Sequence, residues 1–135
     1  MQHTILPKKG LDSILFGAPI EEVIRIMGTP TGVEDIENAC DETTTIVKYE
    51  GITLFFEGEN PTLVCIDITL RDSTLFGQRI FSLDERSIVK LMVGNGFYEQ
   101  DIDTETWGER RITFNEGNID FFFENTRLIS VLFGK

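Results

Sequence analysis

Residues that carry out chemistry are scarce in this sequence, which has one histidine and two cysteines among 135 residues. A Ser-His-Asp or Cys-His arrangement would depend on His3, which lies in a terminus that we expect to be frayed. Cys40, Cys65 and one histidine cannot form a closed zinc site, and no glycine-rich phosphate loop is present. We therefore expect no enzyme activity, no metal and no cofactor.

Long apolar runs are also missing. The first ten residues lack the apolar stretch of a signal peptide, and neither a lipid-anchor cysteine nor a transmembrane span follows. Without an export signal, two free thiols are expected rather than a disulfide. The sequence therefore indicates a cytoplasmic protein.

Positive charge is in short supply. Lysine and arginine number 12 against 23 aspartates and glutamates, which gives a net charge of −11, and the half 1–70 is the more acidic, with twelve acids and four bases. This balance disfavours nucleic acid and anionic membranes as partners. It is typical of a solvated acidic surface, and it also suits a basic protein partner reached by electrostatic steering.

Two segments of the sequence repeat each other. Residues 52–57, ITLFFE, match residues 119–124, IDFFFE, at four of six positions. A weaker echo is the tripeptide Leu-Phe-Gly at 15–17 and again at 75–77. A tandem repeat of one supersecondary unit usually presents a surface and seldom builds an active site.

Apolar periodicity predicts two helices. Over residues 20–27 the apolar positions are spaced i, i+3, i+4, i+7, with Pro19 suited to the first turn and Gly28 to the end. The tetrapeptide Ser-Leu-Asp-Glu at 82–85 is a capping-box pattern for a second helix, which we expect to end near 94–96.

Three strands are expected after each helix, beyond an acidic loop. We place them at 44–50, 52–57, 63–71, 109–115, 118–124 and 127–133, joined by short turns. The predicted fold is therefore α+β in a single domain. It consists of two tandem helix-plus-three-strand repeats, about 11–72 and 73–135, which form one antiparallel sheet with helices on one face and an open opposite face.

Alternation along these strands assigns side chains to the two faces. The covered face receives Ile52, Leu54, Phe56, Val64, Ile66, Ile68, Ile119, Phe121, Phe123, Ile129, Val131 and Phe133. The open face receives Thr53, Phe55, Glu57, Asp120, Phe122 and Glu124, together with Lys48, Arg111, Leu63, Cys65, Asp67, Leu128 and Leu132. An aromatic centre with a polar rim is typical of a protein interface, although the two phenylalanines could instead only complete strand pairing or lie under the N-terminal arm.

Residues 14–30, ILFGAPIEEVIRIMGTP, resemble a helix-entry motif of a known superfamily. The motif opens the helix–loop–strand repeats of β-lactamase inhibitor protein-like and SmpA/OmlA outer-membrane lipoproteins. The resemblance implies a sheet whose concave open face grips another protein. This chain lacks the export signal and disulfides of the secreted inhibitors and the lipidated cysteine of the lipoproteins. Bacterial immunity proteins can also be small, acidic and cytoplasmic, and this chain is similar to them in these general properties alone.

The leading hypothesis is a cytoplasmic protein-binding module of inhibitor or immunity type, which blocks its partner sterically through the open face. The predicted site comprises Phe55, Phe122 and Trp107 as apolar anchors, Lys48, Arg111 and Asp67 as polar rim, and Glu37, Asp41, Asp101 and Asp103 as acids that steer a basic partner.

Two alternatives stay open. The open face could instead close a homodimer, or the acidic loops could weakly bind a cation or small molecule. Residues 101–106 alternate acids as a calcium loop does, but Thr106 and Ile112 occupy the positions that require glycine and a bidentate acid.

Overall fold

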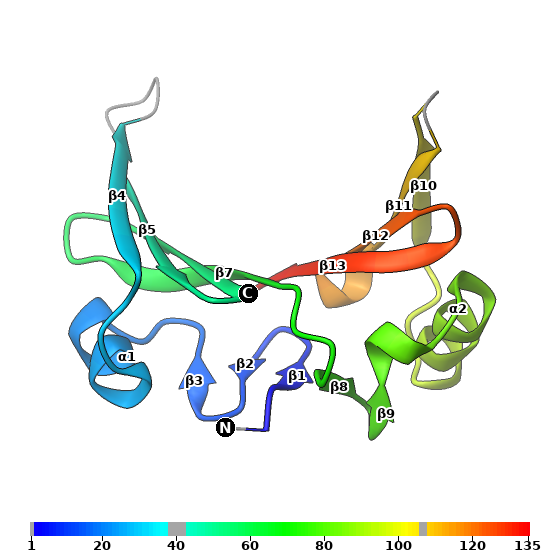
Figure 1. Cartoon of the computed structure of the whole chain (residues 1–135), viewed down its shortest axis with the longest axis horizontal. Helices are drawn as coiled ribbons and strands as arrows, with labels where there is room; N and C mark the ends of the chain where they lie inside the picture. The colour runs from blue at the N-terminus through cyan, green and yellow to red at the C-terminus, as the bar shows by residue number, and fades with distance from the viewer. Residues whose placement is uncertain (1, 38–42, 106–107) are drawn as a thin grey trace.

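The computed structural model describes residues 2–37, 43–105 and 108–135. Within these ranges the chain forms two α-helices, two short 3-10 helices and thirteen strands in two sheets, so the fold is mostly β (Figure 1). The predicted α+β fold of two helix-plus-three-strand repeats on one sheet is therefore wrong. Each helix is followed by four strands, because part of each acidic segment interpreted as a loop is an edge strand, and a second sheet is present.

The larger sheet contains eight antiparallel strands in the order β10-β11-β12-β13-β7-β6-β5-β4. One half consists of β4 (Gly32–Glu37), β5 (Thr43–Tyr49), β6 (Ile52–Glu57) and β7 (Thr62–Ile68). The other consists of β10 (Gln100–Thr104), β11 (Glu109–Phe114), β12 (Ile119–Glu124) and β13 (Arg127–Gly134). Since β7 pairs with β13, the two halves meet at the centre of the sheet, and β4 and β10 form its edges.

The smaller sheet joins the N-terminal segment to the start of the second half. Its strands are β1 (Thr4–Leu6), β2 (Gly10–Leu11), β3 (Ile14–Leu15), β8 (Thr74–Leu75) and β9 (Gln78–Arg79), in the order β3-β2-β1-β8-β9. The expectation of a frayed N-terminus is wrong: the Asp12 carboxylate accepts hydrogen bonds from the N–H groups of His3 and Thr4, and His3 Nδ1 lies 3.0 Å from Asp72 Oδ1.

Both predicted helices are confirmed. The first, α1 (Ile20–Met27), buries Val23 and ends at Gly28, whose φ of 88° suits glycine. The second, α2 (Glu85–Gly94), follows the 3-10 helix η1 (Ile80–Ser82) and begins after Asp84. Asp84 Oδ1 accepts the N–H of Ser87 at 2.8 Å, and this hydrogen bond lowers the pKa of the carboxyl group. None of the helices in the described ranges has the length and apolar content needed to cross a membrane.

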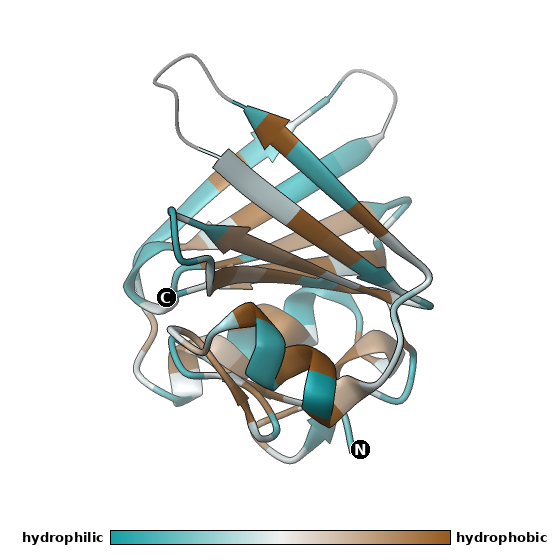
Figure 2. Cartoon of the chain, turned by 90° about the vertical axis from the view of Figure 1, so that its left-hand side faces the viewer, coloured by the Kyte–Doolittle hydropathy of each residue, from teal (hydrophilic) through white to brown (hydrophobic). Residues whose placement is uncertain are grey.

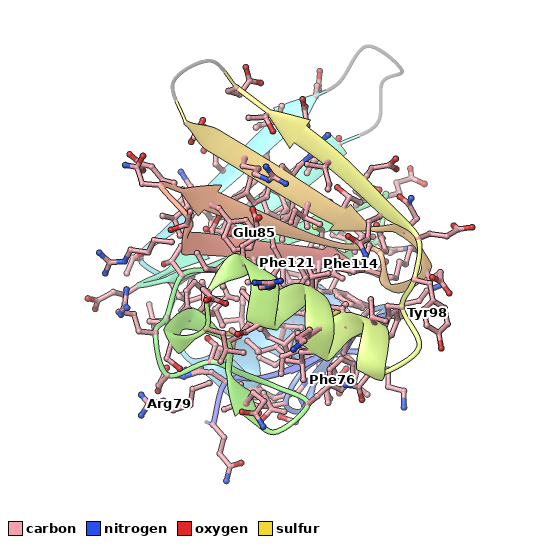
Figure 3. All side chains as sticks on the ribbon, turned by 90° about the vertical axis from the view of Figure 1, so that its right-hand side faces the viewer. Phe76, Arg79, Glu85, Tyr98, Phe114 and Phe121 are labelled. Carbon is pink, nitrogen blue, oxygen red and sulfur yellow. The ribbon has the colours of Figure 1, made fainter. Side chains whose placement is uncertain are left out.

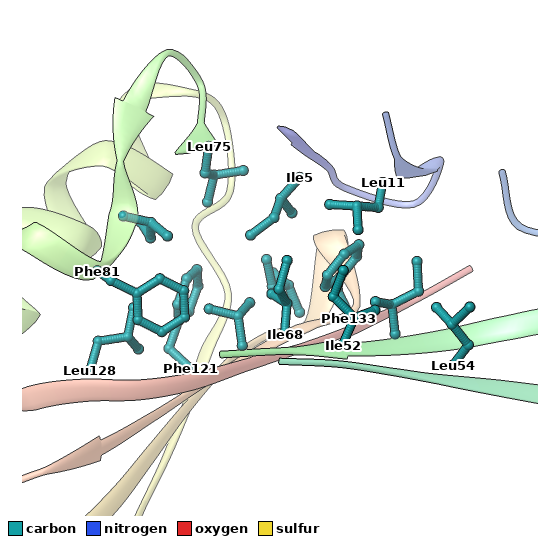
Figure 4. Close-up of a cluster of buried hydrophobic side chains, with 14 of the residues drawn as sticks. Ile5, Leu11, Ile52, Leu54, Ile68, Leu75, Phe81, Phe121, Leu128 and Phe133 are labelled. Atoms are coloured by element: carbon teal, nitrogen blue, oxygen red, sulfur yellow. The ribbon is translucent and has the colours of Figure 1, made fainter. Parts of the chain in front are cut away.

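The hydrophobic core lies between the larger sheet and a layer made by the two helices and the smaller sheet (Figures 1 and 2). Figure 4 shows Ile5, Leu11 and Leu75 facing buried side chains of the larger sheet, Phe121 and Phe133 among them. The ring of Phe121 also packs edge to face on Phe114, with 5.8 Å between centroids. The two helices and the five short strands of the smaller sheet therefore cover this face of the larger sheet together.

A further 3-10 helix, η2 (Asn115–Gly117), connects β11 to β12. Glu116 Oε1 accepts the N–H groups of Tyr98 and Glu99, at 2.6 and 2.8 Å, and these bonds lower the pKa of its carboxyl group. The segment between α2 and β10 is thereby tied to this turn.

A β-bulge occurs at the same place in each half of the larger sheet. Phe55 is opposite Cys65 while Phe56 is opposite Leu63, so β7 has one extra residue, Val64. In the second half Phe122 is opposite Ser130 and Phe123 is opposite Leu128, so Ile129 is the extra residue of β13. On one side of the extra residue, the inward-facing and outward-facing positions of β7 and of β13 are exchanged relative to strict alternation.

The bulges correct four predicted side-chain positions. Leu63 and Leu128, which we expected on the open face, are buried in the core at 0% and 1% exposure. Val64 and Ile129, which we expected in the core, are half-buried. Strict alternation fails here because it assumes two residues per pleat throughout the strand.

Candidate functional site: the concave face of the larger sheet

The face of the larger sheet that points away from the helices is concave. Figure 1 shows the outer strands β4 and β10 rising on either side of the central strands β7 and β13. No described element lies over this face, because both helices and the smaller sheet pack on the other one. The N-terminal arm, one possible cover for Phe55 and Phe122, is part of the smaller sheet and so lies on the core side.

Phe55 and Phe122 occupy equivalent positions on this concave face. Each lies directly before the bulge of its half, and each alternates with buried phenylalanines or leucines of the core. Both side chains are half-buried although no described element covers them, because neighbouring strands flank them. The prediction that both phenylalanines belong to the open face is confirmed by the strand register.

The centre of the concave face carries two carboxylates on either side of an apolar side chain. Leu132 of β13 is opposite Asp67 of β7 on one side and opposite Asp120 of β12 on the other. Thr113 donates a hydrogen bond from its hydroxyl to Asp120 Oδ1. Cys65, Asp120 and Leu132 also line a hollow of about 270 Å³ that reaches Lys135.

Asp67 is the least satisfied of these acids. Its Oδ1 atom is shielded from solvent and has no hydrogen-bond partner in the ranges 2–37, 43–105 and 108–135. Burial raises the pKa of this carboxyl group, since a low-dielectric surrounding disfavours the charged form. We predicted Asp67 in the polar rim, but it lies at the half-buried centre of the face. A donor supplied from outside would relieve its desolvation.

Cys65 lies beside these acids and is an unreactive thiol. Burial, together with the negative charges of Asp67, Asp120 and Glu57, raises its pKa to about 11. The nucleophilic thiolate is therefore a minor species at neutral pH. The side chain contributes apolar surface to the concave face rather than chemistry.

The two predicted basic residues of the rim are paired with acids of the edge strands. Lys48 Nζ lies 3.2 Å from Glu34 Oε2, and Arg111 Nη2 lies 3.5 Å from Asp103 Oδ2. These are exposed pairs of the kind that add little stability. Each acid offsets the positive charge of its basic partner.

Beside the second of these pairs, Phe122 lines a hollow of about 120 Å³ together with Asp103, Glu105 and Arg111. An aromatic side chain thus faces a recess with mixed charge in the second half of the face.

Acids outnumber bases among the strand residues of the concave face. The register places eight acids there: Glu34, Glu57, Asp67, Asp101, Asp103, Glu109, Asp120 and Glu124. Three bases, Lys48, Arg111 and Arg127, accompany them. The surface is therefore strongly negative at neutral pH.

The steering acids of the prediction divide into three groups. Asp101 and Asp103 lie on the concave face of β10, where Asn115 donates a hydrogen bond to Asp101 at 2.8 Å. Glu37 lies on β4 with its side chain on the opposite face, and its role as a steering acid stays a prediction. Asp41 and Trp107, like Cys40, fall outside the described residues.

Asp120 is the residue that sequence reasoning did not select. It stands two residues before Phe122, as Thr53 stands two before Phe55, so strand alternation placed it on the open face, although it was not chosen for the predicted site. Its proximity to Asp67 depended on the pairing of β7 with β13, which has no signature in the sequence.

In the part of the chain that the structure describes, no three His, Cys, Asp or Glu side chains come together as metal ligands. The segment 101–104 that alternates acids is strand β10 rather than a loop, which differs from the calcium-loop interpretation. Its two aspartates already contact Asn115 and Arg111.

Comparison with protein-family models, curated proteins and solved structures gives no match to this chain. The resemblance of residues 14–30 to the β-lactamase inhibitor protein-like and SmpA/OmlA superfamily therefore stays a prediction.

Proposed function

We propose that this chain is a protein-binding module that holds a basic partner in the concave face of its larger sheet and blocks that partner sterically, as inhibitor and immunity-type proteins do. The observation that carries the proposal is the uncovered concave face itself, with half-buried Phe55 and Phe122 near its centre and acids around them. Aromatic anchors inside a polar surround are the usual anatomy of a protein interface.

The charge of the face favours a basic protein over a second copy of the chain. A homodimer closed through this face would bring Asp67, Asp120 and Glu124 of one copy against a surface of the same sign. Lysine or arginine side chains of a different protein would instead supply donors to the unsatisfied Asp67 oxygen. The free thiol of Cys65 is in keeping with a cytoplasmic location, which we propose as well.

We expect a tagged wild-type chain to capture a basic protein from a lysate of the source organism at low salt, and to capture less of it at high salt. The double variant Asp67→Asn/Asp120→Asn should slow association several-fold and reduce its salt dependence, because both substitutions remove charge from the docking face. Surface plasmon resonance with the captured protein measures both quantities.

A matched control removes the same charge from another part of the molecule. Glu21→Gln/Glu22→Gln alters two exposed acids in the first turn of α1, on the helix side of the structure. Its association rate should stay close to that of wild type. Equal slowing by both double variants would mean that net charge, rather than the concave face, attracts the partner.

A further inference from the structure

The outer edge of β4 is an open sheet edge. β4 is the last strand of the larger sheet, and in the described part of the chain no strand pairs with its outer side. Five of its six residues are exposed, including Val33 at 58% and Ile36 at 45%. An exposed edge presents unpaired backbone N–H and C=O groups, which an extended segment can satisfy by adding a strand.

Both faces of β4 combine acids with an apolar side chain. Its pairing with β5 places Glu34 and Ile36 on the concave face, and Val33, Asp35 and Glu37 on the opposite face. A strand added at this edge would therefore meet one apolar and one acidic neighbour on the concave face, and one apolar and two acidic neighbours on the other. Opposite charges and apolar pairs across strands each stabilise a sheet.

A second copy of the chain fits this edge badly. Pairing of two β4 strands would concentrate Glu34, Asp35 and Glu37 with the same three residues of the copy. Like charges on neighbouring strands are destabilising, and charged edge strands are a known protection against aggregation. The same charges attract a strand with lysine or arginine at the facing positions.

The other edge of the sheet, β10, provides an internal comparison. Ile102, 53% exposed, is the counterpart of Val33, because each is opposite a buried residue of the next strand. Ile36 lies three residues after Val33, and the residue three after Ile102 is Glu105. Glu105 lies one residue beyond the end of β10, and its N–H donates to the carbonyl of Glu109 in β11. β10 therefore lacks the second apolar contact, and the pattern favours β4.

We propose that the outer edge of β4 binds, by antiparallel strand addition, an extended basic segment of another protein. Read from the position facing Glu37 to the position facing Val33, the complementary order is basic, apolar, basic, basic, apolar. This docking surface is centred on the outer edge of β4, whereas the function proposed above is centred on Phe55 and Phe122. It does not depend on that function.

The test uses a synthetic peptide, acetyl-Thr-Lys-Val-Lys-Lys-Val-Thr-amide, and a control peptide in which glutamate replaces each lysine. Titrated into the isotope-labelled full chain, the basic peptide should shift the NMR amide resonances of residues 32–37 and slow the exchange of their outward-facing amides. Resonances of residues 100–104 should stay unchanged, and the acidic peptide should shift neither segment.

Two matched variants locate the contact. Val33→Lys should weaken peptide binding at least about fivefold, because a like charge replaces an apolar neighbour. Ile102→Lys, the same change at the counterpart position of β10, should leave it unchanged. Phe55→Ser/Phe122→Ser should also retain peptide binding, which separates this surface from the concave face.

Three results would overturn the proposal: no binding of the basic peptide, equal loss in the two lysine variants, or resonance shifts centred on β10 or on the concave face. Dimerisation of the free chain through residues 32–37, seen by sedimentation and by the same resonances, would overturn it in favour of a second copy.

Discussion

Replacing Phe121 with alanine is expected to lower the free energy of unfolding by about 3–5 kcal/mol. The side chain is fully buried between the larger sheet and the opposing layer, where it packs edge to face on Phe114 (Figures 3 and 4). Truncation removes its apolar contacts and leaves a cavity in the centre of the second half. Urea denaturation should show the loss directly, and the melting temperature should fall by roughly 10–20 °C.

The adjacent residue provides the control for this prediction. Phe122 has the same chemistry but lies on the concave face, half-buried and without a covering element. Phe122→Ala should therefore cost about 1 kcal/mol, the ordinary effect of a single substitution. Losses of similar size at both positions would contradict the assignment of the two side chains to opposite faces.

The double variant Phe55→Ser/Phe122→Ser is expected to weaken binding of the captured partner about a thousandfold. Aromatic anchors near the centre of an interface commonly contribute at least about 2 kcal/mol each, and about 4 kcal/mol in total corresponds to three orders of magnitude. Most of the change should appear in the dissociation rate. Isothermal titration calorimetry, supported by a circular dichroism spectrum that shows a folded variant, measures the effect.

A single variant at a distant aromatic residue controls for general surface effects. Tyr98 is 66% exposed, beyond the end of α2 (Figure 3), and its backbone N–H donates a hydrogen bond to Glu116. Tyr98→Ser should bind the partner as wild type does. If the double variant is folded and still binds with wild-type affinity, Phe55 and Phe122 are not anchors of the interface.

Periodicity made both helices and six strands predictable. Val23 in α1 and Ile88 in α2 recur at helical spacing with other apolar residues, and the central strands alternate buried with outward-facing side chains. These patterns exist because each element has one face in the core. Phe55 and Phe122 were assignable to the open face for the same reason.

Elements without a buried face left no such pattern. β4 is exposed at five of its six residues, so the acids of Glu34 to Glu37 suggested a loop although their backbone pairs with β5. Strands of two or three residues, such as β2 and β8, are too short for any period to show. The smaller sheet was not predicted for this reason. The predicted number of larger-sheet strands in each half was three, and the structure has four.

The centre of the site depended on two features that local sequence does not encode. One is the pairing of β7 with β13, which brings Asp67 and Asp120 to either side of Leu132. The other is the bulge in each half, where one extra residue moves Leu63 and Leu128 into the core. The concavity of the open face was implied by the resemblance of residues 14–30 and not by any strand pattern, because it depends on sheet twist that accumulates over eight strands.

Hydroxyl-radical footprinting of the wild-type chain, free and bound to its captured partner, tests directly whether the concave face is the binding surface. Phe55, Phe122 and Leu132 are half-buried but uncovered in the free chain, so they should be labelled there and become protected in the complex. Tyr98 and Phe76, exposed on other parts of the molecule, should be labelled equally in both states. Protection of Tyr98 or Phe76 with unchanged labelling of the three concave-face residues would contradict the account.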